Sequence, residues 1–141
     1  MSIALALLSL VAAEPVAVNA ALLEGLPVVE ARLEAHGEVS ACTGPTLASV
    51  VARMGAASGR EVRGEALRTA VLARARDGYA VLFSLGEIEP LLGDAPIIVA
   101  TRCDDAPLDD EVGPYRLVAE GEARAARSVR QLESLAMIVA E

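Results

Sequence analysis

Aromatic residues are scarce in this sequence, whose 141 positions hold one Phe, two Tyr and no Trp. Proteins bind unpaired nucleic-acid bases largely by stacking them on aromatic rings. The sequence offers few rings for binding of single-stranded nucleic acid. Basic residues are few as well, because twelve Arg and no Lys stand against twenty acidic residues, for a formal net charge of −8. Such a charge repels phosphate backbones and anionic lipid headgroups. The composition therefore argues against nucleic-acid binding and against peripheral membrane attachment.

Histidine and cysteine are also rare, which limits the metal and catalytic sites that the chain can build. His36 is the only histidine and is expected at a turn, so a catalytic triad would depend on one exposed ring. Cys42 and Cys103 have 60 residues between them, which is not the spacing of a zinc site. The acidic residues from Asp104 to Glu111 lack the alternating ligands of a calcium loop and are expected to be a solvated loop.

The N-terminus carries an apolar run from Ile3 to Ala13 that is too short to span a bilayer. It ends in small residues before Glu14 and Pro15, as a cleaved export signal does. We therefore expect residues 1–13 to be a signal peptide, and residues 14–141 to form one periplasmic or secreted domain without a membrane span. The alternative is that the run is a buried first strand. In an oxidising compartment Cys42 and Cys103 can form a disulfide, which the sequence alone leaves open.

Hydrophobic periodicity predicts a chain dominated by short strands. Apolar and charged residues alternate from Val28 to Glu34, His36 and Gly37 supply a turn, and Glu38 to Cys42 can return as the antiparallel partner. Asp77-Gly78 is a strong hairpin signal between two further strands. The other expected strands are Pro96–Thr101, Tyr115–Ala119 and Val129–Val139, and the expected helical segments are Ala20–Leu26, Thr46–Gly55, the start of Glu65–Arg76, and Ser84–Leu92. This order indicates an α+β fold, with compact mixed sheets and short helices.

Two blocks of sequence suggest a known family. The first is DGYAVLFSLGEIEP, from Asp77 to Pro90. The second has Pro107-Leu108, then GPYRLV from Gly113 to Val118, then Gly121, then ARSVR from Ala126 to Arg130. Both resemble motifs of the sulfite-oxidase-like oxidoreductase molybdopterin-binding domain family, in the same order and at similar spacing.

Thr43-Gly44 and Leu47 are similar to the residues that lead into the first helix of that family, so the resemblance covers roughly residues 26–139. It implies a sulfite-oxidase-like fold and a molybdopterin cofactor, whose phosphate is anchored largely by the C-terminal signature. Here Arg127, Ser128 and Arg130 occupy that signature, and Arg116 and Arg124 can widen it. Arginine offers a planar fork of donors that matches phosphate. The alternative is a solvated face on which these arginines pair with Glu120, Glu122 and Glu133.

The sequence departs from the family pattern at the cysteine that would bind molybdenum. In the family that cysteine lies well upstream of the glycine before the helix, whereas Cys42 stands only two positions before Gly44. We therefore expect Cys42 to be structural and expect no residue to be a metal ligand. The catalytic residues stay unassigned. The resemblance allows oxygen-atom or electron transfer at a molybdenum–pterin centre, with a redox partner protein. The alternatives are a non-catalytic binding module for a small anion or a partner protein, and a purely structural domain.

Overall fold

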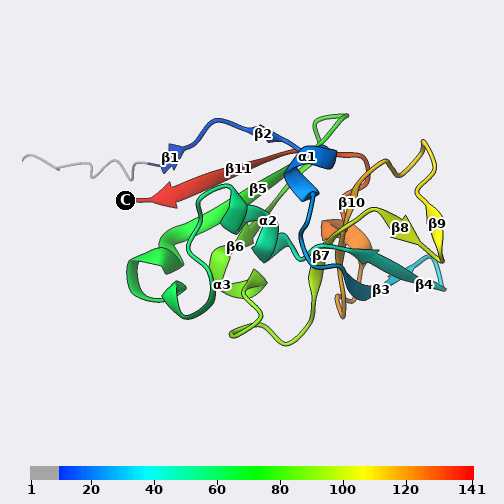
Figure 1. The fold of residues 1–141 in the computed structure, drawn as a ribbon, viewed down its shortest axis with the longest axis horizontal. Coiled ribbons are helices and arrows are strands. Elements are labelled where there is room, and N and C mark those ends of the chain that lie inside the picture. The colour runs from blue at the N-terminus through cyan, green and yellow to red at the C-terminus, as the bar shows by residue number, and fades with distance from the viewer. Residues whose placement is uncertain (1–9) are drawn as a thin grey trace, which may run out of the picture.

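A computed structural model describes residues 10–141 of the chain and shows an α+β fold (Figure 1). The predicted signal peptide lies mostly outside the described residues. Its last part, Leu10–Ala12, forms strand β1, which pairs with the C-terminal strand β11. Among the described residues, no helix is long and apolar enough to cross a membrane.

The largest sheet has five strands, in the order β1-β11-β5-β6, with β2 also paired to β11. Its strands are β1 (Leu10–Ala12), β2 (Val16–Ala17), β5 (Thr69–Ala75), β6 (Ala80–Ser84) and β11 (Leu132–Ala140). Asp77-Gly78 forms the predicted turn between β5 and β6, and Gly78 has the positive φ of 91° that this turn needs. The helical turn predicted before β5 is present as the 3₁₀ helix η2 (Gly64–Arg68).

A second sheet, at the other end of the molecule in Figure 1, has the order β3-β4-β8-β9. Its strands are β3 (Val29–Ala35), β4 (Glu38–Gly44), β8 (Arg102–Cys103) and β9 (Ala106–Pro107). The alternation in β3 is confirmed, because Ala31 and Leu33 are buried while their neighbours are exposed or half-buried. The two strands of a small third sheet, β7 (Ile97–Ala100) and β10 (Arg116–Ala119), are buried along their whole length.

Short helices connect these sheets. They are α1 (Ala20–Leu23), α2 (Leu47–Arg53), α3 (Leu85–Ile88), η1 (Gly59–Glu61) and η3 (Ala125–Arg127). Thr46 caps α2 as predicted, since its hydroxyl accepts a hydrogen bond from the Ser49 amide. The Arg53 guanidinium donates to the Leu22 and Glu24 carbonyls and so joins α2 to α1.

Several predicted boundaries are wrong. The helical segments predicted to end at Leu26 and Leu92 end at Leu23 and Ile88. The last strand begins at Leu132 rather than Val129, because Gln131 has a left-handed backbone (φ 48°) and a register shift follows it. The acidic loop is shorter than predicted, because Asp104 and Asp105 (φ 51° and 61°) form the tight turn of the β8–β9 hairpin. Two consecutive residues of positive φ are what a two-residue hairpin turn requires, and aspartate tolerates that conformation.

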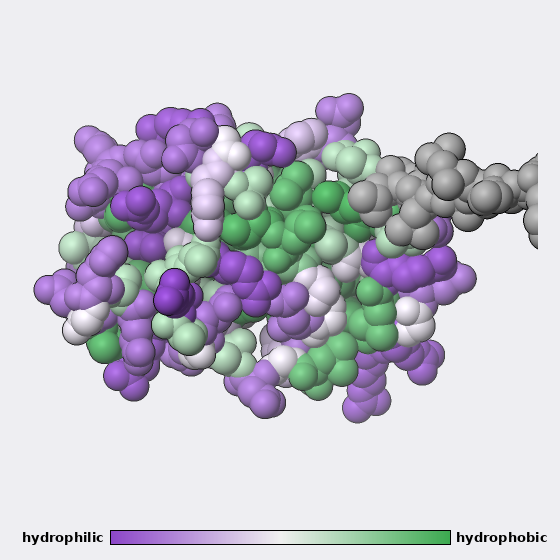
Figure 2. All heavy atoms as spheres, turned by 180° about the vertical axis from the view of Figure 1, so that it is seen from behind, coloured by the Kyte–Doolittle hydropathy of each residue, from purple (hydrophilic) through white to green (hydrophobic). Residues whose placement is uncertain are grey.

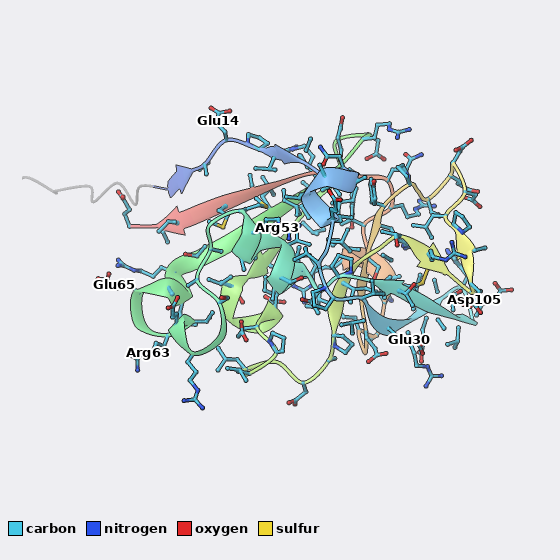
Figure 3. All side chains as sticks on the ribbon, in the orientation of Figure 1. Glu14, Glu30, Arg53, Arg63, Glu65 and Asp105 are labelled. Atoms are coloured by element: carbon cyan, nitrogen blue, oxygen red, sulfur yellow. A yellow bond between two sulfur atoms is a disulfide. The ribbon has the colours of Figure 1, made fainter. Side chains whose placement is uncertain are left out.

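The core has two parts. The larger cluster lies between the five-stranded sheet and helices α2 and α3, and Phe83 is its only fully buried ring. The smaller cluster packs Ala31, Leu33 and Cys42 against residues of β7 and β10. Figure 2 shows apolar surface gathered in the middle of the face opposite to Figure 1, with hydrophilic residues around it. Charged side chains such as Arg63 and Asp105 point away from the body (Figure 3).

Candidate functional site

A cavity of about 610 Å³ is lined by residues from the tips of two hairpins. His36 comes from the β3–β4 turn, Asp77 and Tyr79 come from the β5–β6 turn, and Arg116 and Ser128 complete the lining with residues around them. Small-molecule sites have volumes of roughly 300–1,000 Å³, so the cavity has a suitable size. Two turns that are far apart in the sequence thus frame one concave site.

Arg116 is the unusual residue of this cavity, because its side chain is buried while its charge has no partner. The residue is only 8% exposed. Its Nη2 donates to the Ser128 carbonyl at 2.8 Å, but its buried Nε has no hydrogen-bond partner. Burial lowers the pKa of Arg116 from its ordinary value, and the charge of Arg130 lowers this pKa further. The protein thus pays a desolvation cost at Arg116 that no described carboxylate offsets.

Ser128 holds Arg116 in place through its backbone carbonyl, and its hydroxyl contacts strand β10. Its carbonyl accepts from Arg116, and its Oγ accepts from the Ala119 amide at 3.1 Å. Ser128 is 4% exposed and follows η3 directly. The buried serine therefore links the turn after η3 to strand β10, on which Arg116 lies.

Arg130 and Arg124, two further arginines of the predicted site, differ in their position relative to the cavity. Arg130 lines the same cavity as Arg116 and is exposed. Arg124 is exposed and does not line the cavity. Asp77 and Glu111 also line it, but no ion pair between described residues joins either of them to Arg116 or Arg130. The structure therefore brings Arg116, Ser128 and Arg130 together and leaves Arg124 outside.

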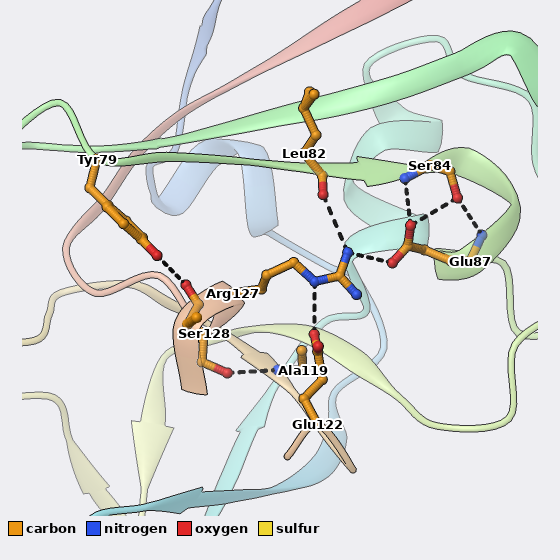
Figure 4. Close-up of polar contacts among 9 residues, drawn as sticks. Tyr79, Leu82, Ser84, Glu87, Ala119, Glu122, Arg127 and Ser128 are labelled. Carbon is orange, nitrogen blue, oxygen red and sulfur yellow. Dashed lines mark hydrogen bonds and ion pairs between the residues drawn. The ribbon is translucent and has the colours of Figure 1, made fainter. Parts of the chain in front are cut away.

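Arg127 lies away from this cavity and is neutralised by two carboxylates. Its Nη1 pairs with Glu87 Oε1 at 2.6 Å and its Nε pairs with Glu122 Oε1 at 2.9 Å (Figure 4). Burial lowers the pKa of Arg127, but the hydrogen bonds and charges of Glu87 and Glu122 outweigh it and raise the pKa above its ordinary value. The pairing with Glu122 matches the alternative expected for this face.

The cysteines are joined in a disulfide. Cys42 and Cys103 face each other across β4 and β8, and their Cα atoms are 4.0 Å apart. These are the only cysteines in the sequence, so no thiolate is available to a metal. The described residues also contain no group of three or more His, Cys, Asp or Glu side chains arranged to hold a metal ion.

Sequence reasoning missed two contributions to this region. Tyr79 and His36 line the cavity, although nothing in the sequence indicates that their two hairpin tips contribute to one cavity. Glu87 is the second carboxylate of Arg127, and its capping-box pattern with Ser84 was the one local signal that it has a fixed position. Comparison with known protein families finds none that matches the chain, and a search among curated proteins finds no match either.

Proposed function

We propose that this chain is a binding domain for a small phosphate-bearing ligand, whose anionic group is held by Arg116 and Arg130. One observation carries the proposal: Arg116, a buried arginine that forms no ion pair with a described carboxylate, lines a cavity of ligand size together with Arg130. An unpaired buried charge is costly, and charge-assisted hydrogen bonds to phosphate are among the strongest that arginine makes. A bound anion would supply the opposite charge that Arg116 lacks.

The phosphorylated pterin implied by the family resemblance fits this site in part. Arg116 and Arg130 suit its phosphate, and the Tyr79 ring beside them suits a planar heterocycle. The metal end does not fit, because Cys42 and Cys103 are consumed by the disulfide. We therefore assign no reaction step to this chain and favour the binding module over the oxidoreductase.

We also propose that the domain works in the periplasm or outside the cell. The apolar N-terminal run supports this location, and so does the Cys42–Cys103 disulfide, because disulfides persist in oxidising compartments. A redox partner protein would be needed only by the oxidoreductase alternative.

The proposal is tested by isothermal titration of the purified protein with inorganic phosphate and with a phosphorylated pterin. We expect both to bind, and Arg116→Met and Arg130→Met each to weaken binding by about tenfold or more, which is the loss of one charge-assisted hydrogen bond. Arg124→Met removes the same charge from an exposed position outside the cavity and is the matched control.

Two cavity variants are used so that the test remains informative if one of them misfolds. Arg116 is buried, so its replacement can disturb the fold, whereas Arg130 is exposed and its replacement should not. Absence of phosphate and pterin binding in the unmodified protein would contradict the proposal. Equal losses in the Arg124 and Arg130 variants would contradict the placement of the site.

A further inference from the structure

The guanidinium of Arg127 contacts other groups within the protein. Besides Glu87 and Glu122 it donates to the Leu82 carbonyl of β6 at 3.3 Å, and its guanidinium carbon lies 4.6 Å from the centre of the Phe83 ring. Figure 4 shows Leu82, Glu87 and Glu122 converging on Arg127 from β6, from α3 and from the chain that follows β10. One side chain therefore ties η3 to three other segments.

The residue next to Arg127 carries the contacts that hold Arg116. Ser128 accepts a hydrogen bond from Arg116 through its carbonyl and one from the Ala119 amide through its Oγ. Beside them, the Tyr79 hydroxyl donates to the Ala126 carbonyl and joins η3 to the β5–β6 hairpin. A shift of η3 would thus displace Ser128, and Arg116 with it.

We infer that Arg127 is a positioning residue for the anion site. With Glu87 and Glu122 it forms a clamp that fixes η3, and through Ser128 it keeps the Arg116 guanidinium directed at the ligand. This inference rests on the proposed function, because it concerns the same cavity. It departs from the sequence-based expectation, in which Arg127 itself bound the phosphate.

The two roles of Arg127 make opposite predictions when its carboxylate partners are removed. If Arg127 bound the anion directly, loss of the competing carboxylates would free its charge, and phosphate affinity would rise. If Arg127 positions η3, the same change would loosen the clamp, and phosphate affinity would fall even though the protein has become less negative. The sign of the change separates the two roles.

The test variant combines Glu87→Gln with Glu122→Ala. Glutamine keeps the capping box of α3, since it can replace glutamate at that position, so the helix start is retained. The matched control combines Glu30→Gln with Glu133→Ala, which removes the same two charges from exposed strand positions outside the cavity. We expect inorganic phosphate affinity to fall about tenfold in the clamp variant, the loss of one well-placed charge-assisted hydrogen bond. The control should change little.

Replacement of Arg127 gives a second readout. Arg127→Met keeps an unbranched stem over Phe83 but removes the clamp, so phosphate affinity should fall, while Arg127→Lys should recover part of it. Each titration is made on protein whose circular dichroism shows it to be folded, far below its melting temperature. A merely structural role would lower the melting temperature and leave the affinity of the folded protein unchanged, which would overturn the inference.

The outcomes distinguish this inference from the proposed function. If the unmodified protein does not bind phosphate, the proposed function fails and the clamp fails with it. If it binds phosphate and Arg130→Met weakens binding, but the clamp variant binds phosphate equally or better, the anion site stands and the positioning role is overturned.

Discussion

At the scale of single residues, Gly44 shows how closely the small sheet approaches the second one. A side chain at Gly44 would place its Cβ 1.9 Å from the Val99 carbonyl oxygen, which is a backbone atom and cannot move away cheaply. The Val99 and Thr101 amides donate to the Pro45 and Thr43 carbonyls on either side of Gly44, so β7 is held against the end of β4. The glycine is therefore required for space and not for a special backbone angle.

Gly44→Ala should destabilise the protein by about 3 kcal/mol or more, since the added methyl group must push two hydrogen-bonded strands apart. Urea unfolding followed by circular dichroism measures the change. Gly86→Ala is the control, because its Cβ would meet only the flexible end of Leu67 at 3.1 Å and alanine suits a helix. Similar losses in the two variants would show that the close approach at Gly44 is not what matters.

The arginines show that the partners of a charged side chain could not be predicted from the sequence. Arg116 and Arg127 both belong to the family-like blocks, but one lies buried without a counterion and the other lies between two carboxylates. The difference comes from Glu87, which is 40 positions from Arg127 and reaches it only because α3 follows β6. Residue type predicted a region rich in arginine, whereas the partners of each arginine depended on the tertiary structure.

At the scale of elements, the start of α3 combines a helix cap with an ion pair. The Ser84 hydroxyl accepts from the Glu87 amide, and the Glu87 carboxylate accepts from Ser84 and pairs with Arg127. Burial raises the pKa of Glu87, but the hydrogen bonds with Ser84 and the charge of Arg127 outweigh it, so the pKa lies below its ordinary value of 4.5. The charged form of Glu87 therefore stabilises the fold.

The sign of this shift predicts how stability depends on pH. A carboxylate whose pKa is lower in the folded chain contributes its stability above the unfolded pKa, and the contribution disappears as the pH falls through the folded pKa. Glu87→Gln should thus be less stable than the unmodified protein at pH 7, and the difference should shrink below pH 4.5 and vanish once the pH is below the pKa of Glu87 in the folded chain. The side chain is 36% exposed, so screening keeps the effect near 0.5 kcal/mol.

Urea unfolding at several pH values measures this difference. Glu65→Gln is the matched control, because Glu65 also pairs with an arginine but its side chain is 92% exposed. A difference between Glu87→Gln and the unmodified protein that stayed constant from pH 7 to strong acid would show that the charge of Glu87 is not involved.

Local signals predicted the elements well where the sequence contains a turn motif, a helix cap or a regular alternation of apolar and charged residues. The Asp77-Gly78 turn, the Thr46 cap and the alternation in β3 each specify their element within a few residues. The β8–β9 hairpin was missed because its strands have two residues each, and its acidic composition is typical of a solvated loop. Strands this short depend on pairing with β4, which no local pattern encodes.

At the scale of the whole molecule, the candidate site depends on how the sheets are arranged. The cavity is lined by residues from the tips of the β3–β4 and β5–β6 hairpins, which belong to different sheets, and by Arg116 of β10. The fold class was predictable from the order of elements, but the lining of one cavity by both of these tips was not. Long-range pairings such as β5 with β11 bring the C-terminal arginines toward them, and these pairings are set by the packing of the core.

The disulfide acts on the same scale, because it links β4 to β8 across 61 positions of the chain. A cross-link of that span restricts the unfolded chain, and the chain-entropy estimate gives about 4 kcal/mol of stabilisation. A domain of this size has about 5–15 kcal/mol in total, so the bond supplies a large share. The Cys42→Ala and Cys103→Ala double variant should therefore unfold at much lower urea concentration, with a loss of about 4 kcal/mol.

The double variant leaves no lone thiol in the buried Cys42 position, and alanine fits the small space there. Unmodified protein unfolded with and without reductant gives an independent measurement, because reduction removes the bond without changing any side chain. Agreement between the two losses would attribute the stabilisation to the cross-link itself. A loss below about 1 kcal/mol in both would mean that the packing of β8 against β4 suffices without the bond. Because the bond persists only in an oxidising compartment, a large loss would also tie the stability of this domain to its proposed export.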